Sequence, residues 1–204
     1  MFSFLSGSAQ LEGSTVTIGE TRELIVKDIY PDKPKKDIQM VKNLNEALHY
    51  VLEHLSEEIT PEHIKEVNKA VLFSLHRNAG KYKVVRNKIQ GNPDFKTAHP
   101  RKVPELMSDY CNKIKTISDR TQLLESLGYV HNELQHIHPF SDGNSRTTRM
   151  ILNWLMLKQK LPIIVLKMGS FDEYMSLTKL SKRRGDKKLT NFFQHLIIHE
   201  ELIN

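Results

Sequence analysis

Residues 138–149, which read HPFSDGNSRTTR, form the most informative stretch of the chain. A helix is expected to end at His138, because Pro139 cannot continue a helix and restricts the residue before it. The Asp142-Gly143-Asn144 stretch contains residue types that tolerate turns and left-handed backbone. A second helix is expected to begin directly afterwards. The stretch therefore predicts a helix, a short loop and a helix, with Phe140 anchoring the loop in the core.

The beginning of this second helix is a favourable place for an anion. The first N–H groups of a helix have no partner inside it, and the helix dipole adds positive charge. Arg146 and Arg149 lie three residues apart, and two guanidinium groups on neighbouring faces suit a polyphosphate. Asp142 is suited to hold Mg²⁺ between phosphates, and His138 to take a proton from a hydroxyl. The stretch predicts nucleotide-dependent group transfer; the plainer alternative is a capped turn with a surface arginine pair.

Composition limits the other function classes. The chain has 204 residues, of which 39% are hydrophobic and 26% charged, and this is typical of a single folded domain. Its one cysteine, Cys111, excludes an internal disulfide and a cysteine-based zinc site, and is interpreted as a core residue. The sequence shows neither a signal peptide nor a membrane span, so a cytoplasmic location is expected. The net charge of +6 favours anionic partners.

Apolar residues recur at helical spacing along most of the chain. The segment 81–91, KYKVVRNKIQG, differs, because its β-branched residues alternate weakly and predict a small hairpin. The expected fold class is all-α, a helical bundle with one small β-hairpin, divided into an N-terminal segment 1–20 and a domain 21–204. The expected helices cover residues 37–55, 61–77, a stretch opened by Pro104, 121–136, 145–158, 170–182 and 189–201, and Thr60 is expected to cap the second of them.

The stretch 138–149 resembles the signature of the Fic (filamentation induced by cAMP) domain family, HPFx(D/E)GNGRxxR. Eleven of the twelve residues either match the signature or stand where the signature allows any residue. The departure is Ser145, where the family usually has glycine; a serine would strain the turn by about 1–2 kcal/mol if its φ had to be positive. The resemblance covers about residues 38–200. It implies the Fic helical fold with a hairpin flap, and transfer of AMP from ATP to a Ser, Thr or Tyr hydroxyl of a target protein.

The resemblance also implies individual roles, with ATP and Mg²⁺ as the cofactors. His138 would be the catalytic general base, and Asp142 would be the metal ligand. The target segment would add to the flap as a strand. The implied phosphate-binding residues are Gly143, Asn144 and Ser145 for the α phosphate and Arg146 and Arg149 for the others, and the implied flap residues are Lys83, Val84, Val85 and Ile89.

A second pattern lies near the N-terminus, where residues 8–13 read SAQLEG. It resembles the inhibitory motif (S/T)xxxE(G/N) of the family's class II members, with Ser8, Glu12 and Gly13 at the fixed positions. The motif implies that Glu12 pairs with Arg149 and withholds it from the γ phosphate. A bias of about 2.8 kcal/mol toward this blocked state would silence activity about 100-fold. A solvated Glu12 at a helix end is the alternative.

Other functions remain open at this point. The same fold could move another group such as phosphate or phosphocholine, or remove AMP with the help of Glu12. A catalytically idle module that binds a nucleotide or a partner is another alternative, although the complete histidine, aspartate and arginine set argues against it. Nucleic acid is an unlikely partner because the chain has no recognition motif. His131 and His136 lie about 140° apart around a helix and predict no zinc site. A homodimer is an expectation from the family.

Overall fold

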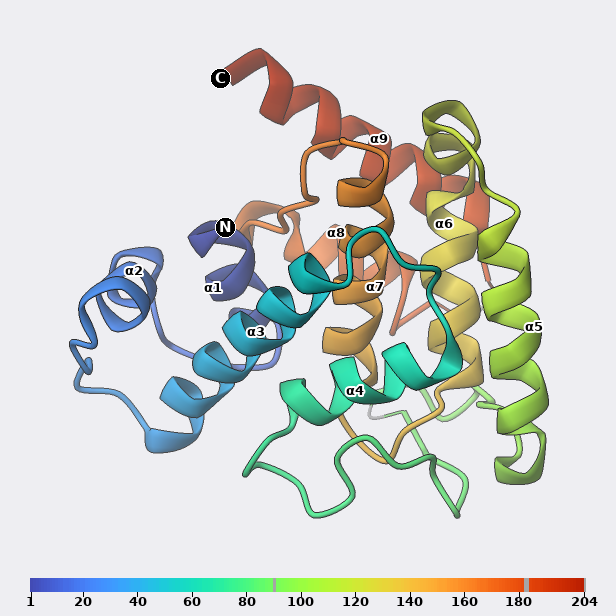
Figure 1. The fold of residues 1–204 in the computed structure, drawn as a ribbon, viewed down its shortest axis with the longest axis horizontal. Coiled ribbons are helices and arrows are strands. Elements are labelled where there is room, and N and C mark those ends of the chain that lie inside the picture. Colours follow the sequence, from blue (N-terminus) through green and yellow to red (C-terminus); the bar gives the residue numbers. More distant parts are fainter. Residues whose placement is uncertain (90, 182–183, 204) are drawn as a thin grey trace.

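The computed structural model describes residues 1–89, 91–181 and 184–203, and their side chains up to residue 198. Over these ranges the fold is helical, with no strand longer than an isolated bridge (Figure 1). This confirms the helical class. The helices are α1 (Phe2–Gln10), α2 (Ile18–Lys27), α3 (Lys35–Glu53), α4 (Pro61–Val71), α5 (Val103–Lys115), α6 (Arg120–Ile137), α7 (Asn144–Lys158), α8 (Phe171–Leu177) and α9 (Asp186–Ile203), with short 3₁₀ turns at Pro100–Lys102 and Met168–Ser170.

Helix α7 forms the centre of the bundle. It packs against α3 and α4 on one side and against α6 on the other, while α5 and α9 flank α6 (Figure 1). Nearly every side chain of α7 is buried, including Trp154 and the apolar residues around it. A helix that is buried all round cannot move independently of its neighbours. The arginines at its beginning are therefore held by the core of the protein.

The sequence signals for helix ends are confirmed where they are strongest. Thr60 caps α4, because its hydroxyl accepts a hydrogen bond from the backbone N–H of His63 at 3.3 Å, and Pro61 is the first helical residue. Asp119 caps α6 in the same way through the N–H of Gln122 at 2.9 Å. Phe140 is 1% exposed and anchors the loop between α6 and α7, as predicted.

The hairpin expected over residues 81–91 is wrong for the described residues. The only pairings there are isolated bridges, Tyr82 with Phe140 and Ile89 with Asn92. The N–H of Lys83 donates to the carbonyl of Pro139 at 2.8 Å instead of to a returning strand. The segment is extended because it pairs with the loop after α6, and a distant backbone partner leaves no signature in local alternation.

Three further elements differ from the prediction. Helix α4 ends at Val71 rather than near residue 77, and Ser74 in the following turns has a φ of 58°. Helix α2 was not expected, because it buries only Thr21 and Leu24 and shows little apolar periodicity. The helix expected over 170–182 is shorter, and residue 182 lies outside the described residues.

The N-terminal elements are packed into the bundle. Helix α1 contacts α2, α3 and α7. The predicted boundary between the N-terminal segment and the domain, at residue 20, falls within helix α2. This boundary stays a prediction. Among the described residues, none of the helices combines the length and apolarity needed to cross a membrane. The cytoplasmic location also stays a prediction.

Candidate functional site

The site is built on the loop between α6 and α7. Helix α6 ends at Ile137, and His138 follows with left-handed backbone, φ 49°. This conformation stops the helix, because the N–H of His138 still reaches back to the carbonyl of Leu134 at 3.0 Å while the chain turns away. Pro139 excludes a right-handed helical conformation at His138. The histidine is thus fixed at the mouth of the loop by its own backbone.

Gly143 and Asn144 shape the turn into α7. Gly143 has a φ of 72°, and a Cβ atom there would lie 3.0 Å from both Asn68 Nδ2 and Leu72 Cγ. Only glycine satisfies both constraints. The side chain of Asn144 bonds the backbone of Phe140 twice, accepting from its N–H at 2.9 Å and donating to its carbonyl at 2.8 Å. Its amide braces the loop, which leaves its backbone N–H as the group available to a phosphate.

Asn68 is a positioning residue that the sequence analysis missed. Its Nδ2 donates to the carbonyl of Asp142 and to Thr147 Oγ1, both at 3.1 Å. Its Oδ1 accepts from the N–H of Gly80 at 3.0 Å. Asn68 is fully buried and ties α4, the loop before α7 and the 72–80 turns together. An amide on the apolar face of the helix, beside Ile64 and Val71, was the signal that could have identified it.

Ser145 causes no backbone strain. It is the second residue of α7 and is absent from the described residues with positive φ. The left-handed position of the turn is Gly143, so the strain considered for serine does not arise. The first backbone bond into α7 runs from the N–H of Thr147 to the carbonyl of Gly143 at 2.9 Å. The N–H groups of residues 144–146 are therefore available to an anion.

Arg146 is a buried cation that lacks a full set of partners. It is 5% exposed, and its Nη2 lies 3.3 Å from Asp142 Oδ1. Its Nε has no hydrogen-bond partner among the described residues. An unpaired buried donor on a charged group is costly, and a bound anion would satisfy it. The guanidinium and the free N–H groups at the start of α7 thus point to the same kind of ligand.

Asp142 is suited to contact a cation at the entrance of the site. Its side chain is 53% exposed, and Oδ1 accepts from the N–H of Gly143 at 2.6 Å as well as from Arg146. The other carboxylate oxygen has no hydrogen-bond or ion-pair partner among the described residues. No group of three His, Cys, Asp or Glu side chains that could form a metal site occurs in the described part of the chain. One carboxylate fits Mg²⁺, which is commonly held by one or two carboxylates and substrate phosphates.

His138 is arranged to accept a proton. Its Nδ1 lies 3.3 Å from the carbonyl of Gln135, which can only accept, so the proton is on Nδ1 and Nε2 is free. Burial, and secondly the positive charge of Lys83, lower the pKa of His138 to about 4. The imidazole is therefore neutral at physiological pH. A neutral ring with a free nitrogen beside Asp142 can serve as a general base.

The N-terminal motif is in contact with Arg149. The Nη2 of Arg149 donates to Glu12 Oε1 at 2.9 Å and to the carbonyl of Ser8 at 3.0 Å, and its Nε donates to Ser8 Oγ at 2.9 Å. Glu12 lies in the turn directly after α1, and Gly13 closes this turn with a φ of 89°. Arg149 is 4% exposed, so its charge is neutralised inside the protein. These three bonds therefore join Arg149 to Ser8 and Glu12 of the motif.

Helix α1 is held close to the core by small residues. Its residues from Phe4 to Ala9 are all buried. A Cβ atom on Gly7 would lie 2.3 Å from the carbonyl oxygen of Leu166, which means that the helix rests directly on that backbone. Ser6 Oγ donates to the carbonyl of Val16 at 3.0 Å and closes the turn after the helix. The position of Glu12 therefore depends on close packing that begins five residues earlier.

A buried chain of hydrogen bonds supports Arg149 from the other side. The Tyr174 hydroxyl is a hydrogen-bond partner of Arg149 and lies 2.7 Å from His131 Nε2. Burial lowers the pKa of His131 to about 3, so its ring is neutral. The Nδ1 of His131 reaches Asn132 Oδ1 at 3.4 Å, and Asn132 donates to Asp186 Oδ1 at 2.9 Å. His131 thus takes part in a structural network of hydrogen bonds.

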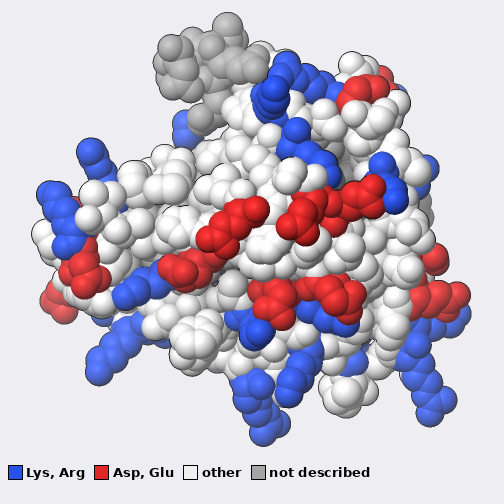
Figure 2. Space-filling view, in the orientation of Figure 1, with Lys and Arg blue, Asp and Glu red and all other residues white. Residues whose placement is uncertain are grey.

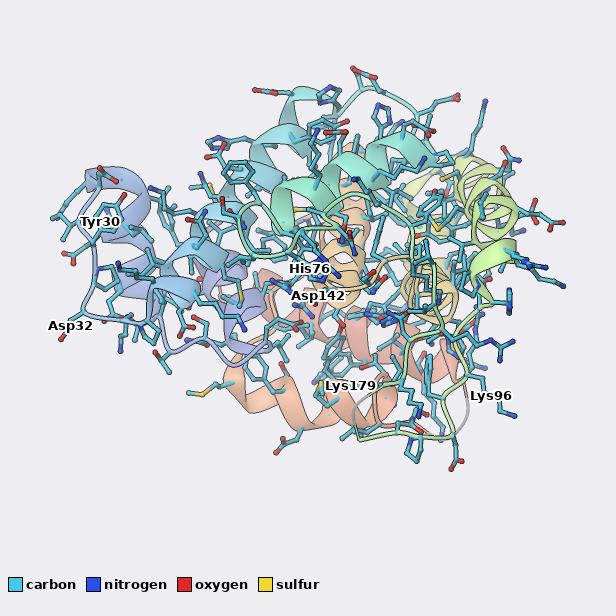
Figure 3. The ribbon with its side chains drawn as sticks, turned by 90° about the horizontal axis from the view of Figure 1, so that it is seen from below. Tyr30, Asp32, His76, Lys96, Asp142 and Lys179 are labelled. Atoms are coloured by element: carbon cyan, nitrogen blue, oxygen red, sulfur yellow. The ribbon has the colours of Figure 1, made fainter. Side chains whose placement is uncertain are left out.

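A cavity of about 200 Å³ joins these parts. Asp142 and Lys179 both line the cavity. Figure 3 shows Asp142 near the middle of the molecule and Lys179 below it, whereas Lys96 lies near the outer edge of the molecule. The cavity brings together most of the residues that the sequence singled out. Its lining includes Glu12, His138, Asp142, Gly143, Asn144, Ser145 and Arg149, together with Asn87, Lys88, Ile89, Tyr174 and Thr178.

The four expected flap residues lie in different surroundings. Val84 and Val85 are 85% and 69% exposed, whereas Ile89 is half-buried and lines the cavity. Lys83 is 3% exposed, and its Nζ donates to Thr97 Oγ1 and to the carbonyl of Ile137, both at 3.1 Å. Lys83 cannot contact a target from this position. It braces the residue before His138 instead.

Comparisons with known proteins find similar sequences and a similar fold. The model of the Fic/DOC family matches residues 58–156. A protein adenylyltransferase Fic of Nematostella vectensis is 29% identical over 85% of the chain, and protein adenylyltransferase fic-1 of Caenorhabditis elegans is 26% identical over 98%. A crystal structure of a Fic domain containing signaling protein from Bacteroides thetaiotaomicron superimposes with a TM-score of 0.80 at 23% identity, covering 97% of this chain and 82% of that chain.

These relatives are longer than the chain. The alignments cover 41% of the Nematostella protein and 40% of the Caenorhabditis protein. The chain thus spans about two fifths of the length of the curated relatives that it matches. The activities of those proteins apply to this chain only as proposals.

Proposed function

We propose that the chain, whose residues 58–156 match the model of the Fic/DOC family, is a protein adenylyltransferase. It transfers AMP from ATP to a hydroxyl side chain of a target protein. The observation that carries the proposal is the joint position of His138, Asp142 and Arg149 around one cavity. The names of two aligned relatives support the transferred group.

The residues of the chain have separate tasks in this reaction. The free Nε2 of His138 takes the proton of the target hydroxyl, whose oxygen then attacks the α phosphorus of ATP. The bond to the β phosphate breaks and pyrophosphate leaves. The N–H groups of residues 144–146 stabilise the charge on the α phosphate, and Arg146 binds the phosphates beyond it. Mg²⁺ held by Asp142 would neutralise phosphate charge.

Glu12 inhibits the enzyme in the state described here. Arg149 donates three hydrogen bonds to Ser8 and Glu12, and these bonds compete with the binding of a γ phosphate. ATP that enters in this state is not aligned for attack at the α phosphorus. A bias of about 2.8 kcal/mol lowers activity about 100-fold, and a buried charge-assisted pair can supply it. The arrangement corresponds to the class II pattern of the family.

Removal of AMP is the second candidate, and the position of Glu12 favours it. Glu12 and His138 line the same cavity, so a water molecule between them could be activated for hydrolysis of an AMP–protein bond. The two candidates differ in the expected effect of Glu12→Gly. This change releases an adenylyltransferase and inactivates a hydrolase.

The proposal is tested by label transfer from two forms of ATP. Wild type, Glu12→Gly and Glu12→Gly/His138→Ala are each incubated with Mg²⁺ and either α-labelled or γ-labelled ATP, with and without cell lysate. Label on protein from the α position only, strongest in Glu12→Gly and absent in the double variant, is expected. Label from the γ position alone would contradict the proposal and indicate phosphate transfer. An absence of label from both positions would leave AMP removal or an idle binding module.

The site does not determine which protein is the target, which type of hydroxyl is modified or whether the chain forms a homodimer. The proposed base and phosphate-binding groups line the cavity, and they suit a Ser, Thr or Tyr hydroxyl alike. The homodimer expected from the family stays a prediction. Sedimentation of the purified chain over a range of concentrations tests it directly.

A further inference from the structure

The positive charge of the chain is concentrated in one segment. Residues 77–102 contain eight Lys and Arg residues and one acidic residue, Asp94, so that their net charge is +7. The whole chain has a net charge of +6, so all other residues together sum to −1. The excess charge noted in the sequence therefore belongs to the segment that connects α4 to α5. We call residues 77–102 the basic segment.

The cations of the basic segment are exposed and unpaired. Lys83 is buried, whereas the other seven are exposed, and none of the seven forms an ion pair with another described residue. These seven residues are Arg77, Lys81, Arg86, Lys88, Lys96, Arg101 and Lys102. Unpaired like charges repel one another over the Debye length, about 8 Å at physiological ionic strength. A segment with this excess of unpaired positive charge attracts a negatively charged partner.

Some cations elsewhere on the surface are paired with acidic neighbours. On α4, Lys65 pairs with Glu62 at 2.7 Å and Lys69 with Glu66 at 3.0 Å. In Figure 2, acidic side chains form a band across the face that carries α3 and α4, and basic side chains project along the lower edge, where Figure 1 draws the loop after α4. The basic segment thus borders an acidic surface without being neutralised by it.

The basic segment is joined to the reacting centre. The N–H of Lys83 donates to the carbonyl of Pro139, and Asn87 Nδ2 donates to the carbonyl of Phe140 at 2.9 Å. Between these two anchors, Val84 and Val85 face solvent, and the backbone of residues 84–86 forms no backbone hydrogen bond within the described part of the chain. An extended peptide can pair with this free edge, and its side chains then lie beside the exposed cations. Its position relative to His138 is set by the two anchors.

We propose that the basic segment is a docking surface for an acidic stretch of the target protein, flanking the hydroxyl that is modified. This inference rests on the proposed adenylyltransferase function and adds the chemical class of the target. The free backbone edge supplies sequence-independent hydrogen bonds, and the cations select carboxylates on either side of the hydroxyl. Target choice then depends on charge around the acceptor rather than on the acceptor alone.

The nucleotide does not account for this surface. Among the seven exposed cations, only Lys88 lines the cavity. Nucleic acid fits less well than a peptide, because the two aromatic residues of the segment are half-buried against other rings: Tyr82 packs on Phe140 and Phe95 on His136. Bases need exposed aromatic faces for stacking. The exposed apolar side chains here are valines, which suit the side chains of a strand.

The test uses the full chain with Glu12→Gly and fluorescein-labelled synthetic peptides of equal length with a central threonine. Glutamates, glutamines or lysines flank the threonine, and a single-stranded DNA of equal charge serves as a fourth probe. Fluorescence anisotropy at low ionic strength measures binding, and α-labelled ATP measures AMP transfer in the same samples. The glutamate peptide is expected to bind about tenfold more tightly than the glutamine peptide, and this preference should weaken with salt.

A triple variant and a matched control locate the effect. Lys81→Gln/Arg86→Gln/Lys96→Gln should remove the preference for glutamate and leave the affinity for ATP unchanged. Lys35→Gln/Lys36→Gln/Lys187→Gln removes the same charge from exposed positions elsewhere and should keep the preference.

Each result has a distinct meaning. Equal binding of the glutamate and glutamine peptides would overturn the docking surface, and so would tighter binding of the DNA than of the glutamate peptide. Loss of the preference in the control variant would also overturn it, because general charge would then be the cause. Preferential binding of the glutamate peptide without AMP transfer would support the docking surface and contradict the proposed function. AMP transfer without a preference for the glutamate peptide would support the proposed function and contradict the docking surface.

Discussion

Glu12 and Arg149 form an ion pair of 2.9 Å across 137 positions of sequence, with the arginine buried. The pair joins the turn after α1 to the central helix of the bundle. Burial acts to lower the pKa of Arg149, but the charge of Glu12 and the hydrogen bonds of the guanidinium outweigh it, so its pKa is raised and the group stays charged. The account of this protein as a braked enzyme depends on that contact and on the packing that presents Glu12.

Gly7→Ala should activate the enzyme without touching Glu12 or the cavity. A Cβ atom at this position meets the carbonyl oxygen of Leu166 at 2.3 Å, so α1 must move away from the core and carry Glu12 with it. AMP transfer should rise at least about tenfold, although the variant loses stability. Gly19→Ala is the matched control, since a Cβ atom there meets nothing within 4 Å. Rates measured with α-labelled ATP that are equal in both variants would contradict the mechanical link.

Asn68→Ala should inactivate the enzyme by releasing the loop. The change removes the two donated bonds to Asp142 and Thr147 and leaves the N–H of Gly80 without its acceptor. Removing one partner of a buried hydrogen bond costs about 1–3 kcal/mol, so the fold should survive with a lower melting temperature. In the Glu12→Gly background the rate constant should fall more than the apparent affinity for ATP. A steady-state comparison that showed full activity would contradict the positioning role.

Asp142→Asn should separate ATP binding from Mg²⁺. The amide keeps an oxygen that can accept from Gly143 and Arg146, but it removes the charge that attracts a cation. Calorimetric titration of Glu12→Gly with ATP should show tighter binding when Mg²⁺ is present, and Asp142→Asn should lose this difference together with activity. Asp109→Asn, on the exposed side of α5, is the control. AMP transfer that persists in EDTA would refute the metal role.

The stability of the fold should decrease as the pH falls below about 6.5. Burial lowers the pKa of His131 to about 3 and that of His138 to about 4, whereas both are near 6.5 in an unfolded chain. Between about pH 4 and 6.5 the unfolded chain binds more protons, so the free energy of unfolding rises with pH, by about 1.4 kcal/mol per pH unit for each histidine. This stability is present above pH 6.5 and is lost on acidification.

Urea unfolding at several pH values measures this slope. His138→Ala and His131→Gln should each reduce it by the contribution of one histidine relative to wild type. Parallel pH profiles for the wild type and both variants would show that neither ring is held neutral by the fold.

Local signals in the sequence predicted the loop between α6 and α7 well, because its determinants are neighbours. Pro139, the turn residues and the arginines of α7 act within twelve positions, and the structure places them as expected. The pairing of Glu12 with Arg149 came from the resemblance of the N-terminal motif, since no periodicity links residues so far apart. The structure confirms the contact that the resemblance implied.

Long-range polar contacts account for what sequence reasoning missed. Asn68, and the link from Tyr174 through His131, become visible only when α4, α6 and α8 are assembled. The expected hairpin failed for the same reason, since Lys83 finds its backbone partner at Pro139. The concern about Ser145 disappeared once the left-handed position was seen to be Gly143. In each case the deciding partner is distant in the chain.

The rate of AMP transfer in three forms of the chain tests the central claim most directly. Wild type, Glu12→Gln and Glu12→Gly are compared on one target preparation with α-labelled ATP, and Arg149→Ala in the Glu12→Gly background is the blank. We predict the lowest rate for wild type, a higher rate for Glu12→Gln, in which the charge is lost but the hydrogen bond can persist, and the highest for Glu12→Gly. Equal rates in the three forms would contradict the conclusion that Glu12 restrains this enzyme through Arg149.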